Sequence, residues 1–380
     1  MKILYLILLY NGEINGGHTY RMATAKALKN IVGYDNLDLV LSELDTSDWG
    51  CNIIMRMKSY TSTRDKIRNL VQGNITQRSD EDIDKIVKLI NDNKYDIVLF
   101  GSSETGKLIR EVKNRCDVKT MTWYHDIVAD VINRKIKSEF NLKMFPIWCA
   151  ERKAEKLDAK YTDVPIVLHQ RDANLLKKYW GRDTNVFIPI ALEDSFIPYD
   201  ISEIADNDGI LELLFVGAYN WAVNVEAVKW FCENVMCKLE NYNVRFNIAG
   251  FQMEKLIDDG WVSDYSNVRV LGTVDNLAET YKMVDVVVEP ILTGSGMKVK
   301  TAEALMHGKE IIGTDEALVG YDELKDDVCL TGNDFIKKIV QFTERRPQKF
   351  VQKNREYYEK NYSIDGITKK LKDSIKILEG

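Results

Sequence analysis

The sequence has little of what builds a disulfide framework or a metal centre. Its six cysteines are scattered and form no C-x-x-C pair, and its four histidines are too dispersed for an H-E-x-x-H motif. Scattered thiols of this kind are typical of reduced cysteines in the cytoplasm. The pattern therefore argues against a disulfide-stapled secreted domain and against a metal site, and it predicts a cytoplasmic protein.

Long apolar runs and an excess of basic residues are also missing. No stretch reaches the roughly 20 apolar residues that a transmembrane helix needs, and the net charge of −6 argues against nucleic-acid binding. The first ten residues, MKILYLILLY, are apolar, but they lack a small-residue cleavage site and polar Asn11, Gly12 and Glu13 follow at once. This segment predicts a buried parallel strand rather than a signal peptide.

What the chain does have is a repeated alternation of short apolar runs and longer amphipathic segments. Such alternation predicts parallel sheets covered by helices on both faces. With 380 residues, the chain is longer than a domain with a single hydrophobic core usually is. Residues 189–208 are acidic and contain two prolines, which predicts a linker between two domains. The expected fold is α/β, with two Rossmann-like doubly wound domains. Strands are expected at residues 2–10, 38–41, 97–101, 118–123, 211–216, 244–249, 268–271, 284–288 and 310–313, and helices at 19–31, 83–91 and 223–239.

Basic side chains gather in one stretch of the first half. Residues 132–160 hold eight basic and four acidic side chains, with three aromatic residues, Phe140, Phe145 and Trp148, among them. One interpretation is a solvated helical surface. The other is a patch that touches anionic lipid or an anionic acceptor, which would bring the protein to the inner face of the membrane.

The segment EPILTGSGMKVKTAEALMHGKEIIGT, residues 289–314, carries the strongest chemical signal. It lies where an expected strand gives way to a helix, and open α/β sheets bind ligands beyond the carboxyl ends of their strands. Gly294 and Gly296 allow backbone N–H groups to approach an anion closely, and Lys298 and Lys300 add positive charge. Glu303, one to two turns into the helix, can accept hydrogen bonds from sugar hydroxyls. A phosphate site beside a sugar site indicates a bound nucleotide.

The same segment resembles the donor-site motif of GT-B glycosyltransferases, in the retaining group called glycosyl transferases group 1 (family 4-like). The stretches 213–231, 267–290 and 187–198 also resemble segments of that family, in the same order. The resemblance implies two domains facing across a cleft. Residues 1–198 would bind the acceptor, residues 199–361 would bind the nucleotide sugar, and a C-terminal helix within 362–380 would cross back to the first domain.

The resemblance also implies roles for individual residues. Lys298 and Lys300 would neutralise the leaving diphosphate, and His125 would contact the donor sugar as a third catalytic residue. Glu303 would hold the ribose. Backbone groups near Val274 would contact the base. The other expected donor-binding residues are Gly16, Gly17, Gly217, Gly294, Ser295, Gly296 and Met297.

The implied activity is transfer of a hexose, with retention and without a metal or other cofactor. The donor would be UDP- or GDP-linked, and the acceptor a glycan, a lipid-linked sugar or a glycoprotein of a bacterial polysaccharide pathway. Two departures favour an alternative, a non-catalytic GT-B partner or chaperone of another glycosyltransferase. Ser295 stands where many members have glutamate, and the loop 217–224 lacks the arginine and lysine that many members carry there.

Three features have a second interpretation from the residues alone. His125 is either a ligand to the donor sugar or a loop histidine with its own partners. Asn224 either shapes the cleft or caps the helix that follows it. The acidic run 80–84 reads as the start of a helix, where acidic residues are favoured, rather than as a metal-binding D-x-D motif.

Overall fold

The structure, a computed structural model, describes residues 1–9, 16–58, 71–74, 78–138, 141–200, 209–262 and 264–378. The chain divides into two compact units. Unit 1 comprises Met1–Ala191 and Ile364–Gly380, and unit 2 comprises Leu192–Ser363. Residues Asn11, Gly12 and Glu13 of the sequence argument, and Phe140 of the basic stretch, lie outside the described residues.

Unit 1 is built on a six-stranded sheet in the order β3-β2-β1-β4-β5-β6, in which each neighbouring pair is parallel. Every residue of β1, β2 and β4 is buried, as expected of strands covered on both faces. The strand predicted at residues 2–10 is found as β1 over Ile3–Ile7, and Tyr10 lies outside the described residues. The strands are β1 (Ile3–Ile7), β2 (Leu37–Ser42), β3 (Asn52–Met57), β4 (Ile97–Phe100), β5 (Lys119–Tyr124) and β6 (Val164–Val167).

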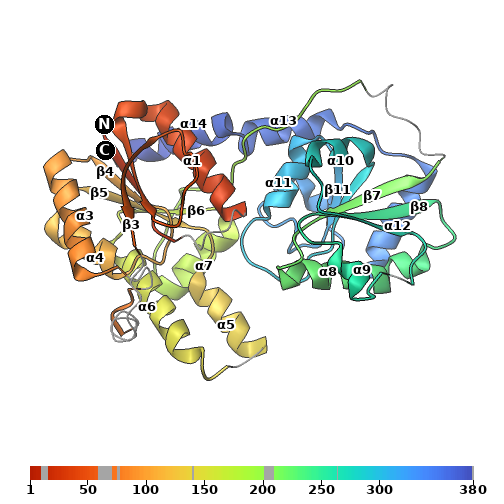
Figure 1. The fold of residues 1–380 in the computed structure, drawn as a ribbon, viewed down its shortest axis with the longest axis horizontal. Helices are drawn as coiled ribbons and strands as arrows, with labels where there is room; N and C mark the ends of the chain where they lie inside the picture. The colour runs from red at the N-terminus through yellow and green to blue at the C-terminus, as the bar shows by residue number, and fades with distance from the viewer. Residues whose placement is uncertain are drawn as a thin grey trace. The chain divides into compact units, whose positions relative to one another are not determined.

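The helices of unit 1 include one from the far end of the chain. Helix α14 (Ile364–Lys376) packs on α1 (Gly16–Val32), so the C-terminal helix returns to the first unit as the sequence predicted (Figure 1). Helix α3 (Asp80–Asn93) begins after Ser79, whose side chain accepts a hydrogen bond from the Asp82 backbone N–H. The acidic run is thus a helix start. The others are α4 (Lys107–Arg115), α5 (Val128–Ser138), α6 (Phe145–Tyr161), α7 (Gln170–Trp180) and the short η1 (Tyr34–Asn36).

Unit 2 is built on a five-stranded parallel sheet in the order β11-β10-β7-β8-β9. The strands are β7 (Leu211–Val216), β8 (Val244–Ala249), β9 (Val268–Gly272), β10 (Val286–Glu289) and β11 (Glu310–Gly313). The helices are α8 (Ala222–Asn234), η3 (Met236–Lys238), α9 (Lys255–Asp258), α10 (Leu277–Met283), α11 (Val299–Met306), η4 (Asp322–Asp327), α12 (Gly332–Glu344) and α13 (Gln352–Asn361).

The predicted helix at 223–239 is too long. Helix α8 ends at Asn234, and a separate 3₁₀ turn, η3, carries the chain on to Leu239. The apolar residues after the break stay buried, because the turn keeps Val235, Met236 and Leu239 on the core side. Apolar periodicity alone therefore could not reveal that the helix ends there.

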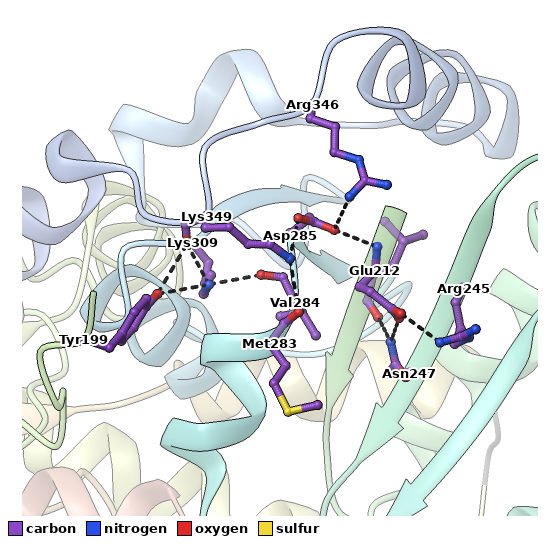
Figure 2. A network of polar contacts seen from close by, with 11 residues as sticks. Tyr199, Glu212, Arg245, Asn247, Met283, Val284, Asp285, Lys309, Arg346 and Lys349 are labelled. Atoms are coloured by element: carbon purple, nitrogen blue, oxygen red, sulfur yellow. Dashed lines mark hydrogen bonds and ion pairs between the residues drawn. The ribbon is translucent and has the colours of Figure 1, made fainter. Parts of the chain in front are cut away.

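A buried polar network ties the amino ends of β7 and β10 together (Figure 2). Asp285, which is 1% exposed, accepts a hydrogen bond of 2.8 Å from the Glu212 backbone N–H and pairs with Lys349 at 2.7 Å. The Glu212 carboxylate in turn accepts from Arg245 at 2.9 Å and from Asn247 at 2.7 Å. Each buried carboxylate here has charged or amide partners, as buried charges require.

Lys309 belongs to the same network and is fully buried. Its ammonium donates to the carbonyl oxygens of Val284, at 3.0 Å, and Lys349, at 2.7 Å, and lies 3.4 Å from the Tyr199 hydroxyl (Figure 2). Burial, together with the charge of neighbouring Lys349, lowers the pKa of Lys309 to about 7. Three oxygen acceptors compensate for the lost hydration of this amine.

Candidate functional site

The candidate site begins where β10 ends, at the carboxyl edge of the unit 2 sheet. The chain leaves the sheet after Glu289, runs through a loop at residues 290–298, and enters α11 at Val299. Gly296 has a φ of 61°, a left-handed conformation that glycine adopts without strain. Within the described residues, the backbone N–H groups of Ser295, Gly296 and Met297 donate to no acceptor. Gly296 and Met297 are buried and Ser295 is half-buried. Because more than nine in ten buried backbone N–H groups are paired, this run without acceptors indicates a place for an anion.

Lys300 stands next to this loop, in the first turn of α11. Its ammonium donates to the Asn224 side-chain oxygen at 2.8 Å and lies 4.1 Å from the centre of the Phe215 ring. Burial lowers the pKa of Lys300 to about 8, although the Glu289 carboxylate opposes this shift. The structure thus holds a half-buried cation in a fixed position with a neutral amide and an aromatic ring, and this leaves its charge available to a ligand.

Glu289, the last residue of β10, is a site residue that the sequence argument missed. Its side chain is 0% exposed, and one carboxylate oxygen accepts from the Thr301 hydroxyl at 2.7 Å. The other oxygen has no hydrogen-bond partner in the part of the chain that the structure describes. Burial raises the pKa of Glu289 to about 7, and Lys300 opposes that shift. A charged residue at the end of the apolar run VVVE was the available signal.

Lys298 is engaged differently from Lys300. Its ammonium pairs with Glu316 at 2.9 Å and donates to two carbonyl oxygens of its own loop, those of Gly296, at 2.9 Å, and Ser295, at 3.3 Å. A Cβ added at Gly294 would lie 3.2 Å from the Lys298 ammonium, so glycine there leaves room for this arrangement. Lys298 therefore shapes the loop, and its expected contact with a diphosphate stays a prediction.

Glu303 lies on α11 beside the ring of Tyr281 from α10. The Tyr281 hydroxyl donates to one Glu303 oxygen at 3.2 Å, and the ring stacks on His307 with centroids 4.5 Å apart. Burial raises the pKa of Glu303, and the hydrogen bond from Tyr281 opposes the shift. The carboxylate is held by one oxygen, which leaves the other able to accept hydrogen bonds from a diol.

The loop after β7 is joined to the candidate site through Asn224. Gly217 faces the Asn224 side chain, since an added Cβ would lie 2.8 Å from its amide carbon. Asn224 donates to the Ala218 carbonyl oxygen at 2.9 Å and accepts from Lys300. The interpretation of Asn224 as a helix cap is wrong, because the N-cap of α8 is Trp221 and Asn224 lies within the helix. Gly217 thus has a packing role, and its role at the donor stays a prediction.

Val274 lies in the connection between β9 and α10, at the same carboxyl edge of the sheet. It is half-buried. Thr273 beside it is fixed by a hydrogen bond of 3.0 Å from its backbone N–H to Glu254. The proposed contact between this segment and a base stays a prediction.

In unit 1, Gly16 and Gly17 form the first turn of α1, and Asn15 before them is outside the described residues. His125 follows β5, and its Nε2 hydrogen-bonds the Gly101 carbonyl oxygen at 2.8 Å. Burial, together with the charge of Arg21, lowers the pKa of His125 to about 3. The neutral ring must therefore donate from Nε2, and its Nδ1, buried and without a partner among the described residues, is left as an acceptor.

No group of three or more His, Cys, Asp or Glu side chains that could hold a metal ion is found in the ranges that the structure describes. The same residues contain no helix long and apolar enough to cross a membrane. All six cysteines are free.

Comparison with solved structures shows that the whole chain shares its fold with known glycosyltransferases. HepE from Anabaena, solved in complex with UDP and glucose, is 14% identical, with a TM-score of 0.66 over 99% of each chain. Sucrose-phosphate synthase from Thermosynechococcus elongatus is 14% identical, with a TM-score of 0.71 over 100% of this chain and 99% of that one. The pneumococcal O-GlcNAc transferase GtfA, solved with UDP and GlcNAc, is 13% identical, with a TM-score of 0.62 over 100% and 99%. The predicted fold class, two Rossmann-like domains of the GT-B type, is confirmed.

A sequence family adds to this structural likeness. Residues 211–352 match the family described as Glycosyl transferases group 1. The matched region runs from β7 to the start of α13 and contains the loop at 290–298 and all of α11. The resemblance stated for this region from the sequence is therefore confirmed. No curated protein matches the chain.

Proposed function

We propose that the chain transfers a sugar from a nucleoside-diphosphate sugar to a glycan, lipid-linked or protein-linked acceptor, with retention and without a metal. One observation carries the proposal: three successive backbone N–H groups, of Ser295, Gly296 and Met297, have no acceptor among the described residues and lie beside the fixed ammonium of Lys300. Residues 199–361 would bind the donor and residues 1–198 the acceptor.

The chemistry follows from where charge develops. Breaking the bond between the anomeric carbon and the diphosphate places negative charge on the leaving oxygen. Preorganised N–H donors and a fixed cation stabilise that charge without having to reorganise. Lys300 and the loop amides would supply this stabilisation. The leaving phosphate would accept the proton of the attacking hydroxyl, so a protein nucleophile is not needed for retention.

Glu303 would orient the donor through its ribose. Its carboxylate is held by Tyr281 at one oxygen and lies on the helix that follows the phosphate loop. His125 would accept a hydrogen bond from a sugar hydroxyl at Nδ1, since its Nε2 is held by Gly101. HepE and GtfA were solved with UDP, which supports UDP as the carrier. A GDP-linked donor is the alternative.

The deciding experiment is calorimetry of the full chain against UDP, GDP and a panel of their sugars, followed by a transfer or hydrolysis assay with the best ligand. We expect UDP to bind and Glu303→Ala to lower turnover at least about tenfold, because its orienting hydrogen bonds are lost. Glu344→Ala, an exposed carboxylate at the end of α12, is the matched control. If no nucleotide binds, or both variants keep full activity, the proposal is wrong.

A second candidate is a non-catalytic partner of another glycosyltransferase. Ser295 in place of glutamate favours it, as does the pairing of Lys298 with Glu316. A protein of this kind would bind no sugar nucleotide and would hydrolyse none. Binding of UDP followed by turnover in the same experiment excludes it.

A further inference from the structure

Helix α6 of unit 1 separates its charges by sign. The acidic side chains Glu155 and Asp158 are 0% exposed and face the protein interior. Glu155 accepts from the backbone N–H groups of Val128, at 2.6 Å, and Ala129, at 2.9 Å, and so caps α5. Asp158 accepts in the same way from Thr105 and Gly106 before α4. The negative charge of α6 at these two positions is thus used inside the protein.

The lysines of the same helix lie on its opposite, exposed side. Lys153, Lys156 and Lys160 follow each other at intervals of three and four residues, which places them on one face. In the part of the chain that the structure describes, no carboxylate lies within ion-pair distance of any of them. Lys153 donates to the Val71 carbonyl oxygen at 2.7 Å, and the Lys160 ammonium lies 5.2 Å from the centre of the Tyr161 ring. Like charges at this spacing repel by a few tenths of a kcal/mol per pair, and none of the described carboxylates compensates for that repulsion.

This lysine stripe lines a cavity of about 870 Å³. The end of α7 and the segment after it also line the cavity, through Tyr179, Trp180 and Arg182. The volume lies within the range of small-molecule sites. The cavity is bounded entirely by residues of unit 1. The full lining is Lys153, Lys156, Leu157, Ala159, Lys160, Tyr179, Trp180 and Arg182.

The aromatic wall is fixed in place. The Trp180 ring N–H donates to Glu155 at 2.8 Å, and the Tyr179 hydroxyl donates to Asp130 at 3.0 Å. Arg182 donates to the Thr162 carbonyl oxygen at 2.9 Å, while its Nε, buried, has no partner among the described residues. Rigid rings beside a guanidinium and three ammonium groups suit a ligand with an anionic group and a flat or sugar-like body.

We propose that this cavity between α6 and α7 binds a phosphate ester, carried either on a soluble sugar or on a lipid headgroup. Lys153, Lys156, Lys160 and Arg182 hold the phosphate, whose charge and oxygen acceptors match several cations better than one carboxylate would. The rings of Tyr179 and Trp180 contact the body of the ligand. Its residues all belong to unit 1, whereas the loop at 290–298 belongs to unit 2, and the inference does not depend on the proposed transfer reaction.

The test measures binding of two phosphate-bearing probes to the full chain. Glucose 6-phosphate is titrated by calorimetry against glucose, and vesicles of phosphatidylglycerol are compared with vesicles of phosphatidylcholine by co-sedimentation. We expect at least one of the anionic probes, glucose 6-phosphate or phosphatidylglycerol, to bind, its match without net charge to fail, and added salt to weaken the binding. Binding of the sugar phosphate identifies a soluble ligand, and binding of the anionic vesicles alone identifies a headgroup.

Charge reversal separates this cavity from general electrostatic attraction. Lys156→Glu with Lys160→Glu should weaken binding at least about tenfold, which is about 1.4 kcal/mol. Lys369→Glu with Lys372→Glu, an equal charge change on exposed positions of α14, should leave it unchanged. The double substitution Lys156→Gln with Lys160→Gln removes the two charges without reversing them and so perturbs folding less. It should reduce binding affinity by less than the charge reversal does. No binding by the wild-type chain, or equal loss in both reversed variants, overturns the proposal.

The two sites are told apart by crossed readouts. Lys156→Glu with Lys160→Glu should keep the affinity for UDP, whereas Lys300→Ala should keep the affinity for the sugar phosphate or vesicles. A failure of UDP to bind would therefore remove the proposed transfer reaction and leave the cavity untouched. Loss of the phosphate probe in Lys300→Ala as well would place both ligands in one site and end the proposal.

Discussion

The two ends of strand β10 bury carboxylates in opposite ways. At the amino end, Asp285 is paired with Lys349 and bonded to the Glu212 backbone (Figure 2). At the carboxyl end, Glu289 keeps one oxygen without a partner among the described residues, and the loop beyond it has unpaired N–H groups. Asp285 directly precedes β10 and Glu289 is its last residue, so the two carboxylates are four residues apart in the chain.

The contrast between these two carboxylates distinguishes polar groups that stabilise the fold from polar groups that are available to a ligand. Buried polar groups that have all their hydrogen-bond partners stabilise the fold and make it specific. When one partner is removed, the remaining buried group keeps its desolvation penalty without a compensating hydrogen bond. Groups left unpaired in a folded protein cost stability, so they persist where a ligand completes them. The amino end of the sheet should therefore govern stability and the carboxyl end activity.

The largest effect is expected at the amino end. Asp285→Ala removes the carboxylate partner of Lys349 and the acceptor of the Glu212 N–H group, and should lower the free energy of unfolding by about 3 kcal/mol. Urea denaturation measures this change. Affinity for UDP at low temperature should stay within about twofold of the wild type. A stable variant that has lost UDP binding would contradict the division between the two ends.

The next largest effect is expected at Lys300. Lys300→Ala removes the fixed cation beside the loop and should lower kcat/KM about a hundredfold, as for loss of one charge-stabilising donor in other enzymes. The unfolding free energy should not fall, because burying this ammonium costs stability. Steady-state kinetics and urea denaturation of the same preparation test both statements. Equal loss of stability and activity would make Lys300 a structural residue.

A smaller effect concerns pH. In Glu289→Gln, Lys300 loses the carboxylate that favours its charged form, so its pKa falls below about 8. The alkaline decline of kcat should then shift down by about one pH unit, measured as a pH profile. A variant with a lower kcat but an unshifted profile would show that Glu289 acts only in packing.

The same substitution should change stability in a defined direction. The folded pKa of Glu289 is raised from 4.5 to about 7, so its stabilising contribution is present below pH 4.5 and is lost as pH rises through about 7. Glu289→Gln should remove this decline. Unfolding free energies measured between pH 4 and 8 test the sign.

The smallest effect is expected at Lys298. Its ammonium is occupied by Glu316 and by two loop carbonyls, so Lys298→Met should lower kcat/KM only about threefold, through the loop shape. Adding Glu316→Gln should recover part of the loss, because the unpaired carboxylate is then removed. A decrease as large as that in Lys300→Ala would mean that Lys298 moves to the ligand.

Much of the fold could be predicted because, in the inner strands, the run of apolar residues in the sequence coincides with the residues that the fold buries. The strand at 211–216 is found with the predicted bounds, and each of its residues is buried. Strand β3 was not predicted, since at the edge of its sheet five of its six residues are only partly buried or exposed, and its sequence, NIIMRM, does not alternate. Local pattern is weakest where tertiary packing is incomplete.

Less of the site could be predicted. The loop at 294–297 and Lys300 were identified from glycine spacing and charge. The contacts of Asn224 with Lys300 and of Lys298 with Glu316 join residues 76 and 18 positions apart in the chain. Spacing within a motif carries no information on such contacts. Glu289 was overlooked because a carboxylate closing a strand looks like its solvent-exposed end, whereas the fold buries it completely.

Unit 2 is an insertion within unit 1, and its two ends are adjacent. The Leu192 backbone N–H donates to the Tyr362 carbonyl oxygen at 2.9 Å, and Leu192 also bridges to Ser363. A gene in which codons 192–363 are replaced by a short turn would thus still encode every strand of the first sheet and its last helix. A stop codon at 364, by contrast, would spare the whole inserted domain and strip a helix from the domain that was translated first.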